Sequence, residues 1–143
     1  MKRIRLLLLL TFLTHFFTLF GYAHAAGFIG LAEILYFPYV THEHFSLILT
    51  DTQESYLPAV AMLGFIGNIT LLVAFFMKHT HTRNIVYYTG IMAYWMSIAY
   101  LWYDSTFLGH SQFSLVFCVP LLIASTLLIT QKHLARVSGW IKN

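Results

Sequence analysis

The stretch that decides the fold is "LPAVAMLGFIGNITLLVAFFM", Leu57 to Met77, which contains no Lys, Arg, Asp or Glu. A helix rises about 1.5 Å per residue, so about 20 apolar residues cross the hydrocarbon core of a bilayer. Three further stretches have the same character, so the predicted helices cover residues 6–32, 57–77, 85–103 and 113–131. The sequence therefore predicts an all-α fold, an integral membrane four-helix bundle, forming one domain over residues 1–143.

The composition supports a bilayer as the surrounding medium. The chain is 59% hydrophobic and 9% charged, whereas about 25% of the residues in an average soluble domain are charged. A soluble fold of 143 residues could not bury this much apolar surface, so the lipid bilayer is the first predicted partner. The single cysteine, Cys118, excludes a disulfide or a CxxC pair within the chain.

The charged residues separate by sign along the chain. Basic residues precede the first apolar stretch, separate the second from the third and follow the fourth: Lys2, Arg3, Arg5, Lys78, Arg83, Lys132, Arg136 and Lys142. All the acids lie elsewhere: Glu33, Glu43, Asp51, Glu54 and Asp104. The positive-inside rule then predicts both termini inside and an antiparallel up-down-up-down order, with an outer loop at 38–56 and an inner amphipathic tail at 132–143. The net charge of +3 reflects this topology and predicts no nucleic-acid partner. The short loops favour a multi-pass protein of the bacterial inner (plasma) membrane.

The N-terminal segment allows a second interpretation. "MKRIRLLLLLTFLTHFFTLFGYAHAA", residues 1–26, has a basic start, an apolar middle and a small-x-small motif, Ala23 to Ala25. These are also the features of a secretory signal. Retention of the first helix is the favoured interpretation, and cleavage after Ala25 is the alternative, which would leave three spans.

Each predicted helix carries a seam of small or weakly polar residues at spacings of three and four. In lipid, helices associate through close backbone approach and hydrogen bonds between such residues, and these spacings place residues on one helical face. We therefore expect the seams to face one another inside the bundle. Their members are Thr11, His15, Thr18 and Tyr22; Ala61, Gly64, Gly67, Asn68 and Leu71; Gly90, Ala93, Ser97, Tyr100 and Asp104; and Ser111, Ser114, Cys118 and Ser125.

His15 is the ionisable residue expected deepest in the membrane. It follows Arg5 by ten residues, or roughly 15 Å of helix, which places it near the midplane. Asn68 and Ser97 are expected at a similar depth. One interpretation is a neutral histidine that fixes helix packing. The other is a functional residue that lines a path for a small solute or ion, with lining residues His15, Tyr22, Asn68, Ser97 and Tyr100.

Two histidine pairs suggest further sites on opposite sides of the membrane. In "PYVTHEHFSL", Pro38 to Leu47, an extended H-x-H puts both rings on one face, which begins a metal site but supplies only two ligands. The candidate outer metal residues are His42, His44, Asp104 and His110. His24 could pair with His110 as axial haem ligands. On the inner side, the histidines of "KHTHTR", 78–83, would add to attraction for lipid phosphates as pH falls.

The sequence contains no constellation that predicts catalysis. It has no phosphate loop, HExxH or dinucleotide motif, and no seam serine has an evident base beside it. The chain resembles small drug-exporting four-helix proteins in size and topology only, because it lacks their first-helix glutamate. The favoured prediction is a non-catalytic accessory subunit or lipid-phase binding module, partnered by lipid or a larger membrane protein complex. The alternatives are a small-solute or ion carrier and, more weakly, a metal- or haem-handling membrane protein. The cofactor is unknown.

Overall fold

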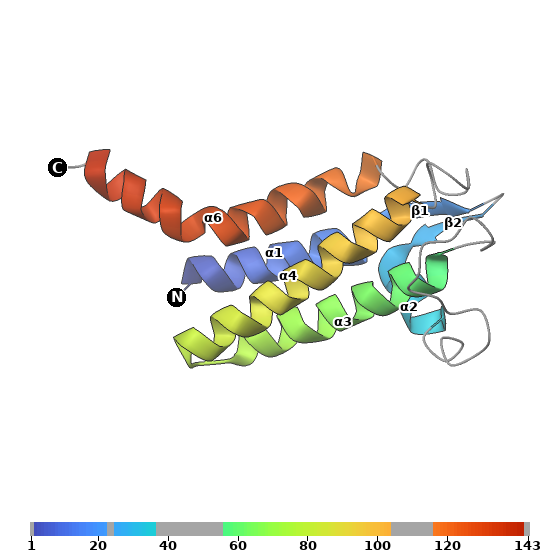
Figure 1. Ribbon diagram of the computed structural model, residues 1–143, viewed down its shortest axis with the longest axis horizontal. Helices are drawn as coiled ribbons and strands as arrows, with labels where there is room; N and C mark the ends of the chain where they lie inside the picture. The colour runs from blue at the N-terminus through green and yellow to red at the C-terminus, as the bar shows by residue number, and fades with distance from the viewer. Residues whose placement is uncertain (1, 23–24, 37–55, 104–115, 142–143) are drawn as a thin grey trace.

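The computed structural model describes residues 2–22, 25–36, 56–103 and 116–141 (Figure 1). This part of the chain is helical apart from one short β-hairpin, so the predicted helical class is confirmed. The elements are α1 Lys2–Phe16, β1 Leu19–Tyr22, β2 Ala25–Phe28, α2 Ile29–Tyr36, α3 Leu57–Phe76, α4 Thr80–Tyr103 and α6 Val119–Ile141.

The four longest described helices lie alongside one another and alternate in direction (Figure 1). α3 and α4 form the most extensive pair, and α1 packs against both α3 and α6. The start of α1, the α3–α4 connection and the end of α6 lie at one end of the molecule, which we call the cationic end because its segments carry the basic residues (Figure 1). The β-hairpin and α2 lie at the opposite end (Figure 1).

The expectation of one continuous helix over 6–32 is wrong. α1 ends at Phe16, and the strands β1 and β2 pair antiparallel before α2 begins. The backbone of Thr18 connects the two sides of this break. Its N–H donates to the His15 carbonyl at 3.0 Å, and its carbonyl accepts from the Ile29 N–H at 2.8 Å. Glycine inside a helix costs about 1 kcal/mol relative to alanine, so Gly21 and Gly27, which lie in the paired strands, weaken the helical alternative.

The other helices lie close to their expected positions. α3 ends one residue before the predicted 57–77, and Pro58 occupies its first turn, where the missing N–H of proline is tolerated. α4 begins at Thr80 instead of 85 and so takes in most of the "KHTHTR" segment. α6 continues to Ile141, so the expected separate tail is the helical continuation of the fourth apolar stretch. The predicted residues 113–115 lie outside the described part.

Every seam residue whose side chain the structure describes is buried, as predicted. These residues are Thr11, His15, Thr18, Ala61, Gly64, Gly67, Asn68, Leu71, Gly90, Ala93, Ser97, Tyr100, Cys118 and Ser125. The outward faces carry large apolar side chains that are exposed, among them Leu6, Ile69, Leu72, Phe76, Ile85, Met92, Trp102, Val116 and Ile123. The small and polar seam residues are therefore buried beside an apolar core that includes Leu71, Ile91 and Leu128, while many other bulky apolar side chains face outward.

Two glycines allow α3 and α4 to approach closely. A Cβ atom at Gly67 would collide with the ring of Tyr94 and come within 3.2 Å of the Gly90 carbonyl oxygen. A Cβ atom at Gly90 would collide with the Thr70 hydroxyl. The α3–α4 contact therefore depends on the absence of side chains at these two positions.

Within the described residues, α3 alone is long and apolar enough to cross a membrane, judged by length and composition. Residues 4–16 of α1 and 119–131 of α6 form apolar helical segments that are shorter. One helix of the described part therefore has the length and composition of a membrane span.

Candidate functional site

A buried polar network joins α1, α3 and α4. His15 is 1% exposed, and its ring stacks on that of Tyr94 with the centroids 4.1 Å apart and the planes 25° from parallel. Tyr94 is fully buried, and its hydroxyl donates a 2.6 Å hydrogen bond to Oδ1 of Asn68. One tyrosine thus connects the histidine and the asparagine that the sequence placed at a similar depth.

The sequence of α4 explains why Tyr94 reaches this position. Tyr94 follows Gly90 by four residues and precedes Ser97 by three, so it shares their helical face. Gly67 on α3 leaves the space that the ring fills. Tyr94 was missed from the sequence because few aromatic residues were included in the seams, although the spacing from Gly90 and Ser97 was a sufficient signal.

The remaining predicted path residues have different surroundings. The Ser97 hydroxyl donates to the Val60 carbonyl oxygen at 2.9 Å, which ties α4 to α3. Tyr100 packs against Tyr56, with the ring centroids 5.8 Å apart. Tyr22 lies on β1 and not on the continuous first helix that was expected to carry it. The structure therefore brings His15 and Asn68 together through Tyr94 and places Ser97 and Tyr100 in the α3–α4 packing.

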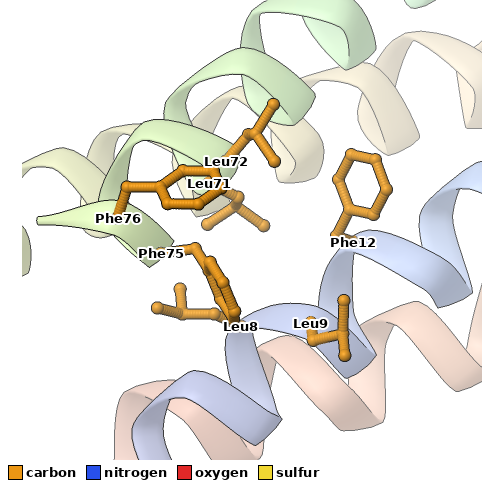
Figure 2. Close-up of a pocket in the computed structure, with 7 residues that line it drawn as sticks. All are labelled: Leu8, Leu9, Phe12, Leu71, Leu72, Phe75 and Phe76. Atoms are coloured by element: carbon orange, nitrogen blue, oxygen red, sulfur yellow. The ribbon is translucent and has the colours of Figure 1, made fainter.

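A second feature is an apolar pocket of about 100 Å³ between α1 and α3. Figure 2 shows its lining, which is Leu8, Leu9 and Phe12 from α1 and Leu71, Leu72, Phe75 and Phe76 from α3. This lining includes no member of the His15 network and offers hydrocarbon and aromatic contacts only. The guanidinium carbon of Arg5 lies 6.0 Å from the Phe75 ring centroid, so a cation adjoins the pocket.

The predicted metal and haem residues belong to segments outside the described part of the chain. They are His24, His42, His44, Asp104 and His110. In the part of the chain that the structure describes, no three His, Cys, Asp or Glu side chains gather as metal ligands would. The inner histidines, His79 and His81, are exposed at the cationic end.

Comparisons with models of known protein families, with curated proteins and with solved structures found no match. Any functional assignment therefore depends on the residues of this chain. Chemically, the network of His15, Tyr94 and Asn68 joins three helices through one stacking contact and one hydrogen bond, an arrangement that fixes the relative position of those helices.

Proposed function

We propose that this chain is a multi-pass integral membrane protein, a four-helix bundle in which α1, α3, α4 and α6 each take part in crossing the bilayer. The observation that carries the proposal is the distribution of side chains: polar groups such as Thr11 and Ser125 are buried, whereas Ile69, Phe76 and Val116 are exposed. Monomeric soluble proteins rarely expose contiguous apolar patches larger than a few hundred Å². Fewer than half of the residues in the most apolar part of α3 are buried, which favours lipid contact over a soluble core.

The charge distribution supports a common inner side for both ends of the chain. The start of α1, the α3–α4 connection and the last part of α6 lie at the cationic end (Figure 1), and by sequence these segments carry Lys and Arg but no acid. Helices α1, α3, α4 and α6 contain no Asp or Glu at all. This arrangement is what the positive-inside rule requires of a protein with both termini inside.

The first crossing is shorter than the others in this proposal. α1 has 15 residues, or roughly 22 Å of helix, against a hydrocarbon core of about 30 Å. We place the β-hairpin at the outer boundary, where its strands satisfy each other's backbone groups and α2 packs against α3. Local thinning of the bilayer accommodates a mismatch of this size at modest cost.

Within that class we propose a non-catalytic binding role, as an accessory subunit or lipid-phase binding module. Stacking and hydrogen bonding engage His15, Tyr94 and Asn68 with one another, which supports a packing role for the network. The surfaces offered to a partner are the apolar outer faces and the pocket between α1 and α3. A carrier is the second candidate, favoured by the buried connection from His15 through Tyr94 to Asn68 in the interior of the bundle.

Purification in mild detergent followed by native mass spectrometry tests this function, with His15→Phe as the variant. Phenylalanine keeps a ring against Tyr94 but removes both ring nitrogens. A binding subunit is expected to retain a stoichiometric protein or lipid partner, and His15→Phe is expected to retain it equally. Saturable solute or ion flux in proteoliposomes that His15→Phe abolishes, at unchanged protein level, would instead establish the carrier.

A further inference from the structure

Side chains from three helices place buried nitrogen atoms at the cationic end that form no well-aligned hydrogen bond within the described part of the chain. Arg83 on α4 is 1% exposed, and its Nε and Nη1 atoms are buried with no partner among the described residues. The same holds for Nε2 of Gln131 on α6 and Nε of Arg5 on α1. Unsatisfied buried donors are rare in folded proteins, and each calls for an explanation.

Arg83 and Gln131 both lie beside Tyr87, and Arg5 lies one helical turn from Leu8, which belongs to the same core cluster as Tyr87. Leu8, Tyr87 and Leu128 pack in one core cluster that joins α1, α4 and α6. Arg5 precedes Leu8 by three residues, Arg83 precedes Tyr87 by four, and Gln131 follows Leu128 by three. Each of the three thus lies about one helical turn closer to the cationic end. The Tyr87 hydroxyl lies within hydrogen-bonding range of Tyr88 and Gln131 and interacts electrostatically with Arg83, although neither hydrogen-bond contact is well aligned.

The chain supplies no negative charge to this cluster from its long helices. A buried guanidinium without a counter-charge is strongly unfavourable. Glu33 lies on α2 at the opposite end (Figure 1), and the other four acids lie in segments outside the described residues, none of them on α1, α3, α4 or α6. The planar fork of arginine donors suits a phosphate or carboxylate oxygen pair, and Gln131 and Tyr87 add neutral donors beside it.

We infer that Arg83 binds a phosphate group, with Gln131, Tyr87 and Arg5 as additional donors. The inference rests on the proposed function, because a bundle with its cationic end at the inner head groups meets the phosphates of anionic phospholipids. The apolar pocket strengthens the lipid assignment, since Arg5 adjoins its Phe75 wall and its lining offers only hydrocarbon and aromatic contacts (Figure 2). Free inorganic phosphate offers the same chemistry and is distinguished by the test.

The test is thermal unfolding of the full chain in neutral detergent, titrated separately with short-chain phosphatidylglycerol, short-chain phosphatidylcholine and inorganic phosphate. We expect phosphatidylglycerol to raise the melting temperature of the wild type more than phosphatidylcholine does. Arg83→Gln should weaken that binding about tenfold or more, as expected for loss of hydrogen bonds from a charged donor. Lys78→Gln, which removes an exposed cation nearby, should change it less than about threefold.

Gln131→Leu provides a second variant that keeps every cation, and we expect about tenfold weaker binding from the loss of one hydrogen bond to the charged phosphate. A response to inorganic phosphate with no preference for phosphatidylglycerol would assign the same site to free phosphate. The inference is overturned if Arg83→Gln responds as the wild type does, or if Lys78→Gln loses as much as Arg83→Gln. If Arg83→Gln does not fold, the other two variants decide. The inference is then overturned if Gln131→Leu and Arg5→Gln both bind phosphatidylglycerol as tightly as the wild type does.

Alkaline extraction of membranes from the cells that express the wild-type protein distinguishes failure of the phosphate site from failure of the proposed membrane function. If the protein stays in the membrane but its melting temperature responds to neither phosphatidylglycerol nor inorganic phosphate, the phosphate site is refuted and the membrane function is not. Protein that alkali releases refutes the proposed membrane function on which the site rests.

Discussion

Tyr94 is the residue through which three helices meet. Its ring stacks on His15, its hydroxyl donates to Asn68, and Gly67 leaves it room. Hydrogen bonds between membrane helices average about 0.6 kcal/mol in measured double-mutant cycles, and aromatic contacts add roughly 0.5–1.5 kcal/mol. The network therefore contributes a moderate stabilisation, and its main effect is to select one packing of α1, α3 and α4.

A double-mutant cycle on Tyr94→Phe and Asn68→Leu tests the hydrogen bond. Each single variant removes the bond, so each should lower the free energy of unfolding by roughly 0.5–2 kcal/mol. The double variant should lose about 0.5–1 kcal/mol less than the sum of the two. Denaturant unfolding in detergent measures the cycle, and strict additivity would show that the two side chains do not interact.

Gly67→Ala tests the close approach of α3 and α4. Helix propensity alone would stabilise this variant by about 1 kcal/mol. The structure predicts the opposite sign, because the added methyl collides with the Tyr94 ring, and overpacking typically costs about 1–3 kcal/mol. A melting temperature at or above that of the wild type would contradict the close contact between Gly67 and Tyr94.

Among the buried polar and aromatic residues, the sequence pattern indicated some and not others. His15 and Asn68 were found because polar groups stand out in an apolar stretch. Tyr94 was missed because its ring resembles ordinary core or interface material. The sequence pattern indicated only an interfacial charge at Arg83. The earlier start of α4 places this residue in the first turns of the helix, where packing against other helices buries it, and such packing cannot be read from one segment alone.

The hairpin between α1 and α2 is the element that the sequence did not predict. Residues 19–28 are apolar and aromatic throughout apart from His24, and periodicity cannot distinguish helix from strand in a short apolar run. The pairing of β1 with β2 and the bond from Ile29 to Thr18 join residues that are not neighbours along the chain, and the local pattern did not reveal these contacts. α3 was predicted closely because its length and lack of charge allow few alternatives.

The contact between α4 and α6 is limited. One side-chain hydrogen bond between these helices is therefore a large part of their direct interaction. Nε1 of Trp95 donates to the Ser125 hydroxyl at 3.0 Å, and Ser125 is fully buried. We expect Ser125→Ala to lower the free energy of unfolding by roughly 0.5–1 kcal/mol and to shift the emission of Trp95. Thr126→Ala, at the exposed neighbouring position, should change neither, and equal effects from both variants would contradict a specific α4–α6 link.

For the molecule as a whole, the solvent determines which side chains face outward. The buried residues include His15, Asn68, Arg83 and Ser125 beside an apolar core, whereas many Ile, Leu, Phe and Met side chains are exposed along the helices. Such a distribution is unfavourable in water and favourable in lipid, where helix association depends on close packing and polar contacts. The seams were predictable because they follow from helical spacing, whereas the binding partner was not, because no motif specifies it.

Ile69→Lys distinguishes the two solvents directly. Ile69 lies near the middle of α3 and is 46% exposed. In water a lysine at such a position would be nearly neutral for stability, whereas at the centre of a membrane helix a lysine costs about 2.5–3.5 kcal/mol. We therefore expect a marked fall in the membrane-inserted fraction, measured by alkaline extraction. Lys78→Ala, in the connection between α3 and α4, should leave insertion intact.

The most direct measurement is the sidedness of single cysteines introduced into a Cys118→Ser background. His81→Cys lies in the first turn of α4, Ser138→Cys lies near the end of α6, and Thr50→Cys lies in the predicted outer loop. With a membrane-impermeant maleimide, the account predicts labelling of Thr50→Cys in intact cells, and labelling of His81→Cys and Ser138→Cys only after permeabilisation. Labelling of His81→Cys and Ser138→Cys from opposite sides would contradict it.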